Sequence, residues 1–248
     1  MPSRATPPVW APTLRRSVRL FSDFRHEQDD PRRFYGALAH DSIGQVSHYH
    51  RLEDARVLDV GGGPGYFRDA FEAAGATYFA LDADVGELAG LGEIARGTVI
   101  GDGMSLPFAD GCVDVCYSSN VLEHVPLPWR MADEMLRVTR PGGIAFISYT
   151  VWFGPWGGHE TAPWHYLGGR RARARYRRTH GKEPKNKYGE SLFPVTVREG
   201  LRWSREQTQG DVIDVIPRYN PRWSWWLTRV PGLREVVTWN LVIVVRKR

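Results

Sequence analysis

The stretch 57–67, VLDVGGGPGYF, decides the fold of this chain. Val57, Leu58 and Val60 form an apolar run that is typical of a buried parallel strand. The chain then turns through glycines into an amphipathic segment, FRDAFEAAG, at 67–75. A strand, a glycine turn and a helix in this order bring backbone close to a nucleotide-like ligand in α/β proteins. Glycine is needed in such a turn because positive φ and close approach both exclude a Cβ.

The spacing within the turn indicates which ligand it binds. A dinucleotide fingerprint would require glycine at position 66, which is Tyr66, and Pro64 removes one amide from the turn. These two departures disfavour a hydride-transferring oxidoreductase. Asp59 adds negative charge beside the turn, which suits an ammonium group better than a phosphate. An acid, a G-x-G-x-G turn and a helix N-terminus together suit an amino-acid-bearing nucleoside, S-adenosylmethionine. The glycines of this pattern are Gly61, Gly63 and Gly65.

Residues 55–150 resemble the class I S-adenosylmethionine-dependent methyltransferases, because four motifs follow one another in the family's order. After the glycine turn, TYFALDAD (77–84) reads as a second strand that ends in Asp82. Residues 98–126 match the third strand, the adenine-side loop and the fourth strand, and residues 135–149 match the next helix, a Pro-Gly-Gly turn and the fifth strand. The resemblance implies an α/β fold with a doubly wound, mostly parallel seven-stranded Rossmann-like sheet, and S-adenosyl-L-methionine as cofactor.

The resemblance also implies where the cofactor is bound. Asp82 lies about twenty residues past the glycines, where an acid holds ribose hydroxyls. In the family, the position of Asp102 accepts from the adenine amine, Gly103 and Met104 flank the ring, and the segment SSNVLEHV (118–125) faces the methyl group. The residues expected to bind the cofactor are Asp59, Gly61, Gly63, Gly65, Asp82, Asp102, Gly103, Met104 and Asn120.

The whole chain resembles a narrower group, the uncharacterised actinobacterial methyltransferases. Three segments carry this resemblance: FRHEQDDPRRFYG (24–36), SYTVWFGPWGGHE (148–160) and the tryptophan-rich C-terminal stretch. The group brings no substrate with it, so the resemblance implies the type of reaction and leaves the acceptor open.

The domain organisation follows from the remaining patterns. Residues 1–50 are expected to hold a loose tail and two helices that cover the sheet or the ligand cleft, with a break at Asp30-Pro31. Residues 51–248 are expected to form the methyltransferase domain. Within it, residues 151–192 are rich in glycine, aromatic residues and arginine, and we interpret them as an inserted substrate-binding region that is partly helical over 168–180.

The C-terminal part is expected to complete the sheet. A helix is predicted from Thr196 to Arg205, with Glu199 as the capping-box partner of Thr196. Residues 211–219 are predicted to be the sixth strand, and residues 241–247 the last strand, antiparallel beside the fifth.

Composition is that of an ordinary globular protein, with 42% hydrophobic and 25% charged residues. No apolar run approaches the roughly 20 residues needed to span a bilayer, and the N-terminal segment lacks the apolar core of a secretory signal. We therefore expect a cytoplasmic location. Cys112 and Cys116 are expected to be reduced strand residues, because a zinc site would need two further ligands and a tighter turn between them.

Histidines near the strand ends are the catalytic candidates. Methyl transfer from a sulfonium is an in-line displacement, so alignment in a dry cleft supplies most of the acceleration, and a hydroxyl acceptor additionally calls for a base. His124 follows the fourth strand and His159 follows the fifth, and both are predicted to act as base or substrate ligand. His124 could instead pack against the cofactor. Glu123, His165 and Tyr149 are the other candidates.

No metal is expected from the sequence. His159 and His165 stand six residues apart across Pro163, which is not a helical pair on one face. Asp82 and Asp84 lack the further carboxylates that a magnesium site would need.

Two C-terminal features concern the acceptor. Residues 221–237 mix tryptophan with arginine, as a segment at an anionic membrane surface does, although the tryptophans could instead cover the last strands. The basic run 170–187 suits a phosphate or another polyanion, or it is a solvated helix face. The net charge of +5 also favours an acidic partner, though only weakly. A small-molecule or lipid-linked acceptor is the expected partner, peripheral contact with the inner face of an anionic membrane is a candidate second interaction, and the oligomeric state stays open.

The favoured function is methyl transfer to a hydroxyl of a small or lipid-linked acceptor. An RNA methyltransferase is the first alternative, but SSNVLEHV lacks the Asn/Asp-Pro-Pro-aromatic pattern that stacks base amines, so nucleic acid is not the expected partner. A non-enzymatic binding protein that retains the fold is the second, and the complete set of cofactor residues argues against it.

Overall fold

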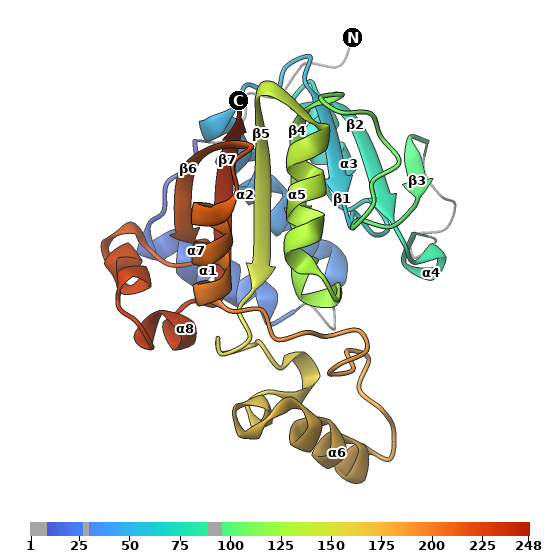
Figure 1. Cartoon of the computed structure of the whole chain (residues 1–248). Coiled ribbons are helices and arrows are strands. Elements are labelled where there is room, and N and C mark those ends of the chain that lie inside the picture. Colours follow the sequence, from blue (N-terminus) through green and yellow to red (C-terminus); the bar gives the residue numbers. More distant parts are fainter. Residues whose placement is uncertain (1–8, 27–29, 89–95) are drawn as a thin grey trace.

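A seven-stranded sheet forms the centre of the protein (Figure 1). The computed structural model describes residues 9–26, 30–88 and 96–248. The strand order is β3-β2-β1-β4-β5-β7-β6, and β7 runs antiparallel to both of its neighbours while the other pairs are parallel. The strands are β1 Arg56–Val60, β2 Thr77–Asp82, β3 Thr98–Ile100, β4 Val113–Ser119, β5 Thr139–Thr150, β6 Gly210–Pro217 and β7 Asn240–Lys247.

Helices cover both faces of the sheet. The α-helices are α1 Leu14–Phe24, α2 Pro31–Tyr49, α3 Arg68–Ala73, α4 Val85–Leu88, α5 Pro128–Val138, α6 Gly169–His180, α7 Val197–Glu206 and α8 Leu233–Val237. Short 3-10 helices are η1 Leu122–His124, η2 His159–Thr161, η3 Trp164–Leu167 and η4 Arg222–Arg229. The predicted doubly wound α/β sheet with an antiparallel last strand is thereby confirmed.

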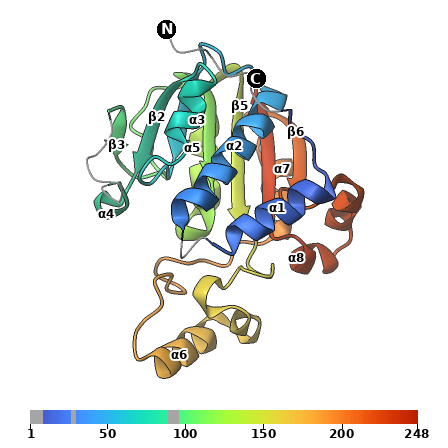
Figure 2. The same cartoon turned by 180° about the vertical axis from the view of Figure 1, so that it is seen from behind.

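The two faces hold two separate apolar clusters. Figure 1 shows α5 and α7 on one face, and Figure 2, from behind, shows α1, α2 and α3 on the other. Leu38 and Val46 of α2 are fully buried against Val57, Tyr117 and other residues of the central strands. On the opposite face, α5 and α7 bury the other side of the same strands. Central strands buried on both faces explain why β1 has an almost continuous apolar sequence.

Helix boundaries follow local capping signals. Asp30 caps α2 by accepting from Arg33 N at 3.2 Å, and Pro31 occupies the first turn, where its missing N–H costs nothing. Thr196 and Glu199 form the predicted capping box at the start of α7. Both predicted helix starts are confirmed. The predicted loose tail lies largely outside the described residues, since only its last part, from residue 9, is described.

The segment between β5 and α7 extends beyond the carboxyl ends of the parallel strands, with α6 at its far end (Figures 1 and 2). Its returning stretch binds back to the domain, because Phe193 N donates to Glu123 O at 2.8 Å and Trp152 N donates to Val195 O at 2.8 Å. Among the described residues, no helix is long and apolar enough to cross a bilayer. Cys112 and Cys116 are free thiols.

Candidate functional site

The glycine turn after β1 leaves open space on one side. Gly61, Gly63 and Gly65 all have positive φ, at 80°, 49° and 87°. A Cβ at Gly61 would collide with Val121, so this glycine allows the turn to lie against the segment after β4. A Cβ at Gly63 would meet nothing within 4 Å. The turn is therefore packed on its Gly61 side and free at Gly63, as a backbone cradle for a ligand must be.

Asp82, at the end of β2, holds this turn in place. Its Oδ2 accepts from Gly63 N at 3.0 Å, and its Oδ1 accepts from Asp84 N at 2.9 Å. Each carboxylate oxygen has a second lone pair, so both can still accept from ribose hydroxyls. The prediction that Asp82 binds the cofactor is compatible with this geometry.

Asp59 is buried beneath the turn. It is 2% exposed, and the Tyr78 hydroxyl donates to its Oδ2 at 2.6 Å. Burial raises the pKa of Asp59 from its ordinary value of 3.8 to about 7, against the opposing effect of the Tyr78 hydrogen bond. Its predicted contact with the ammonium of the cofactor stays a prediction.

The loop after β3 carries the residues expected around the adenine. Asp102 is exposed, and its Oδ1 accepts from Met104 N at 2.8 Å. A Cβ at Gly103 would lie 3.2 Å from Met131 Sδ and from Val60 Cγ1, so the missing side chain at Gly103 lets this loop pack closely against β1 and α5. The loop thus lies beside the end of β1, next to the glycine turn.

Asn120 ends β4 in a left-handed conformation with φ 58°. Its backbone N donates to Ser148 O at 2.8 Å, and its side-chain Oδ1 accepts from Asn240 Nδ2 at 2.7 Å. These bonds fix the start of the segment that leads to Glu123 and His124. The predicted role of Asn120 at the cofactor is not tested by these contacts.

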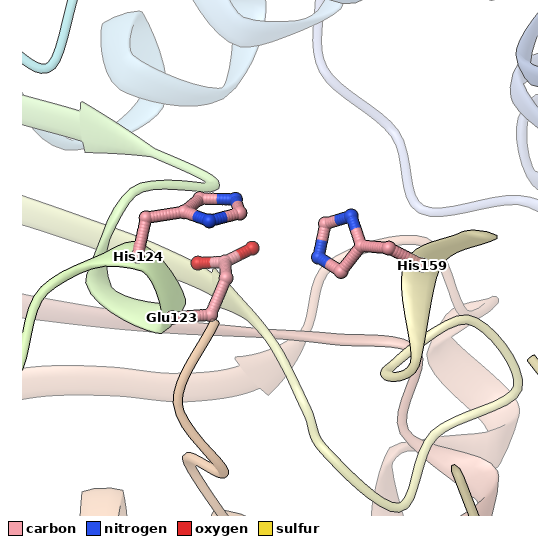
Figure 3. Close-up of side chains that lie close together, drawn as sticks. All are labelled: Glu123, His124 and His159. Carbon is pink, nitrogen blue, oxygen red and sulfur yellow. The ribbon is translucent and has the colours of Figure 1, made fainter. Parts of the chain in front are cut away.

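The two predicted catalytic histidines lie side by side. His124 belongs to η1 after β4 and His159 to η2 after β5, and their ring centroids are 5.1 Å apart. Figure 3 shows both rings and the Glu123 carboxylate pointing toward a common space. One ligand-type atom from each of the three residues lies within 4.8 Å of the other two. We call these three residues the Glu-His-His cluster.

Hydrogen bonds to the cluster show which of its polar atoms already have a partner. Glu123 is 1% exposed, and its Oε1 accepts from Thr150 N at 3.0 Å. His124 Nδ1 lies 2.7 Å from Ser191 O, and because a carbonyl only accepts, this nitrogen carries the hydrogen. In the described part of the chain, Glu123 Oε2 and His159 Nε2 are buried without a hydrogen-bond partner.

Burial also sets the charge of the cluster. It lowers the pKa of His159 to about 3, with smaller effects of the same sign from His124, His165 and Lys185. His159 is therefore neutral at physiological pH and is a weak proton acceptor. Burial raises the pKa of the Glu123 carboxyl.

The remaining candidates have structural partners outside the cluster. His165 is 1% exposed and packs against Trp152 at a ring distance of 5.4 Å, with Nε2 3.3 Å from Gly154 O. The Tyr149 hydroxyl donates to Thr196 O at 3.0 Å. Neither side chain joins the cluster.

One buried charge was not predicted from the sequence. Arg218, at the end of β6, is 1% exposed and donates to the hydroxyls of Ser42, Ser119, Ser148 and Tyr117 at 2.7–3.2 Å. Its partners come from α2, β4 and β5, so nothing in the local sequence around Arg218 indicates this network.

The basic segment is partly neutralised. Arg173 forms ion pairs with Glu183 at 2.8 Å and with Glu190 at 2.7 Å, and Arg177 lies 3.5 Å from Glu183. Arg175 stacks on Trp164, 3.9 Å from the ring centroid. Part of the basic surface predicted to bind a polyanion therefore forms contacts within the inserted region itself.

Comparison with known proteins places the chain among methyltransferases. Residues 58–147 match the family model described as a methyltransferase domain. The chain is 52% identical to an uncharacterized methyltransferase of Mycobacteroides abscessus over 249 residues, which cover 95% of each chain. It is 55% identical to one of Mycolicibacterium vanbaalenii over 244 residues, 94% of this chain and 95% of that protein.

Solved structures share the fold at lower identity. An S-adenosylmethionine-dependent methyltransferase from Mesorhizobium loti superposes with a TM-score of 0.57 at 19% identity, covering 84% of this chain and 98% of that one. The [4+2]-cyclase SpnF superposes with a TM-score of 0.50 at 16% identity, covering 96% and 98%. At these identities the likeness shows the fold alone.

Proposed function

The chain belongs to the same family as these mycobacterial methyltransferases, and from this premise we propose that it transfers a methyl group from S-adenosylmethionine to a hydroxyl. The proposed acceptor is a small or lipid-linked molecule. The observation that carries the hydroxyl assignment is the Glu-His-His cluster at the carboxyl ends of β4 and β5.

The cofactor assignment is supported by the family, by the fold and by the residues at the ends of β1, β2 and β3. The open side of the turn at Gly63 has room for a ligand, and the Asp82 carboxylate beside it keeps lone pairs for two hydroxyls. Asp102, exposed on the neighbouring loop, has the position that would accept from an adenine amine. S-adenosylmethionine supplies an electrophilic methyl group when bound there.

The hydroxyl assignment is supported by the chemistry of the cluster. A hydroxyl must lose its proton as the oxygen attacks the methyl group, whereas the departing sulfur only loses its positive charge. Within the cluster, Glu123 and His124 are the side chains proposed to take up that proton, and His159 is proposed to contact the acceptor. Glu123 and His124 directly follow β4, and His159 follows β5, so the cluster belongs to the sheet edge that also holds the glycine turn.

The lipid-linked class is supported by an exposed apolar face. Its side chains are 41–69% exposed, and they come from α1, η4 and α8. The three segments are neighbours, because Arg222 N of η4 donates to Pro12 O just before α1 at 2.8 Å, and α8 packs against η4. We define the apolar face as Leu14, Val18, Phe21, Trp223, Trp226, Leu233 and Val236.

Basic side chains accompany the apolar face. Arg15 and Arg19 are exposed on α1, and Arg222 and Arg229 are exposed on η4. Tryptophan at headgroup depth with arginine beside lipid phosphates is the composition that binds an anionic membrane surface. Trp225, in contrast, is half-buried and stacks on Trp10 at 6.1 Å, so part of the tryptophan-rich segment covers the fold, as the alternative interpretation had it.

Co-sedimentation with anionic vesicles at low salt tests the membrane contact. The double variant Trp223→Ala/Trp226→Ala should lose most of the binding of the wild-type chain. Ile100→Ser is the control, because Ile100 is as exposed as Trp226, at 56% against 55%, and lies on β3 at the other end of the sheet. Wild-type protein that stays in the supernatant would remove the argument for a lipid-linked acceptor and leave a small soluble one.

The acceptor itself is found by comparing metabolites and lipids of a deletion strain with those of the parent strain. The strain should accumulate a compound lighter by one methylene, and the purified chain with S-adenosylmethionine should convert its hydroxyl into a methyl ether. An accumulating compound that is methylated on nitrogen or carbon in the parent strain would contradict the hydroxyl assignment.

A further inference from the structure

The Glu-His-His cluster brings together buried polar atoms that have no hydrogen-bond partner in the described part of the chain. In the part of the chain that the structure describes, Glu123 Oε2 and His159 Nε2 have no hydrogen-bond partner although both atoms are buried. Leaving a buried polar atom unsatisfied costs roughly 1–3 kcal/mol, and more when the group is charged. A group bound between two such atoms would satisfy both of them.

The tautomer of His124 adds a third acceptor. Because His124 Nδ1 carries the hydrogen that points to Ser191 O, its Nε2 presents a lone pair while the imidazole is neutral. The His159 ring lies beside it, with the two ring centroids 5.1 Å apart, and a ligand-type atom of Glu123 lies within 4.8 Å of both rings' ligand atoms. One glutamate oxygen and two imidazole nitrogens that converge on one space form a possible ligand set for a cation.

Two of the three side chains, His124 and Glu123, have outer contacts of the kind found at metal sites. Histidine ligands almost always donate their second ring N–H to a carbonyl or carboxylate, and Ser191 O has this role for His124. The Glu123 carboxylate is oriented by Thr150 N through its other oxygen. Two imidazoles and one carboxylate form a ligand set that zinc accepts, and three protein ligands leave a fourth position open.

We propose that Glu123, His124 and His159 bind a divalent metal ion of the zinc type, with an open coordination position. The inference departs from the sequence-based expectation of no metal. The ligand atoms now lie within 4.8 Å of one another, and zinc–nitrogen bonds of about 2.0–2.1 Å require the side chains to close around the ion when it binds.

The consequence for catalysis rests on the proposed function, whereas the metal site does not. An acceptor hydroxyl at the open position would have a lowered pKa and would release its proton to water. Its oxygen would then form the bond to the methyl carbon as the carbon–sulfur bond breaks.

Metal analysis of the full chain, purified without a histidine tag, tests the site. After dialysis the wild-type protein should retain about one equivalent of Zn²⁺, and Co²⁺ added to stripped protein should produce visible absorption. Glu123→Gln and His159→Ala should each weaken Zn²⁺ binding by at least the roughly 10–100-fold that loss of an outer partner costs. His180→Ala is the control, because His180 is exposed at the end of α6, away from the cluster.

The variants distinguish ligation from folding. Glu123→Gln keeps an oxygen that can accept from Thr150 N, so it decides the question if His159→Ala unfolds. Wild-type protein without bound Zn²⁺ or Co²⁺ absorption, or Zn²⁺ binding unchanged in Glu123→Gln, would overturn the site. Because Zn²⁺ binding is measured without acceptor or cofactor, such a failure leaves the methyltransferase proposal intact. Conversely, Zn²⁺ binding by a chain that methylates no hydroxyl would contradict only the proposed function.

Discussion

Replacement of Asp82 by alanine tests the placement of the cofactor. The carboxylate of Asp82 is the side-chain acceptor that joins the end of β2 to the glycine turn, through Gly63 N, beside the backbone bonds from Gly61 N and Gly62 N to Leu81 O. If it also holds the two ribose hydroxyls, Asp82→Ala removes those bonds together with the anchor of the turn. The expected result is a chain that folds and has lost its measurable affinity for S-adenosylmethionine.

The size of the loss follows from the bonds that disappear. A hydrogen bond to a charged group contributes roughly 1.5–3 kcal/mol, so two ribose hydroxyls contribute about 3–6 kcal/mol. Each 1.4 kcal/mol corresponds to about a tenfold change in the dissociation constant, which gives a weakening of roughly 10²–10⁴-fold. Asp82→Asn should fall between alanine and wild type, because its amide oxygen can still accept one hydrogen bond.

Isothermal titration calorimetry with S-adenosylmethionine measures the effect, and thermal unfolding checks that each variant is folded. Asp84→Asn is the matched control, since it removes the same charge two residues away, where the carboxylate accepts from Gly86 N at 2.7 Å. Its affinity should stay within about ±0.5 kcal/mol of wild type. Wild-type affinity in Asp82→Ala would refute the assignment of the ribose site to the end of β2.

Three further predictions concern the turn, its buried acid and a helix cap. Gly63→Val should abolish cofactor binding in calorimetry, because a branched side chain at φ 49° would fill the open side of the turn. Retained affinity would mean that this side of the turn does not face the cofactor. Since the pKa of Asp59 is raised to about 7, the folded state holds its proton more tightly than the unfolded chain does, and the free energy of unfolding should fall by up to about 4 kcal/mol as pH rises from about 4 to 7. Thermal unfolding scans should show that Asp59→Asn removes this fall, and a variant with the wild-type pH dependence would contradict the assignment. Thr196→Ala should lower the free energy of urea unfolding by about 1 kcal/mol, whereas Thr196→Ser should keep it, and equal losses would argue against the cap bond.

Most of the fold could be predicted from the sequence because its signals are local. The apolar run and the glycines define β1 and its turn, Asp30-Pro31 starts α2, and Thr196 with Glu199 starts α7. The tryptophan-rich segment left two interpretations open, and the structure contains elements of both, since Trp225 stacks on Trp10 while Trp223 is exposed. Which tryptophan turns inward depends on a partner more than two hundred residues earlier in the sequence, which no local pattern indicates.

The site could be predicted only as separate residues. His124 and His159 were each recognised from their positions after β4 and β5, but their contact depends on the path of the loop after β5. Glu123 was considered as a base, and its burial beside both histidines is a product of the returning segment that contains Ser191. The buried network of Arg218 could not be predicted from the sequence, because its hydroxyl partners are distributed over three other elements.

The two halves of the sheet therefore differ in how far their binding residues can be predicted from the sequence. The cofactor residues lie at the ends of β1, β2 and β3, where the backbone itself forms the binding surface, so glycines and strand-end acids are visible as short motifs. The acceptor side is built by side chains from the segments after β4 and β5, together with the inserted region, and these meet only in three dimensions. SpnF shares this fold and is a cyclase, so the fold by itself does not dictate the reaction at the open end. The Glu-His-His cluster is the part of this chain from which the acceptor chemistry has to be argued, and metal binding by Glu123→Gln is the measurement that separates a metal centre from a set of hydrogen-bonding side chains.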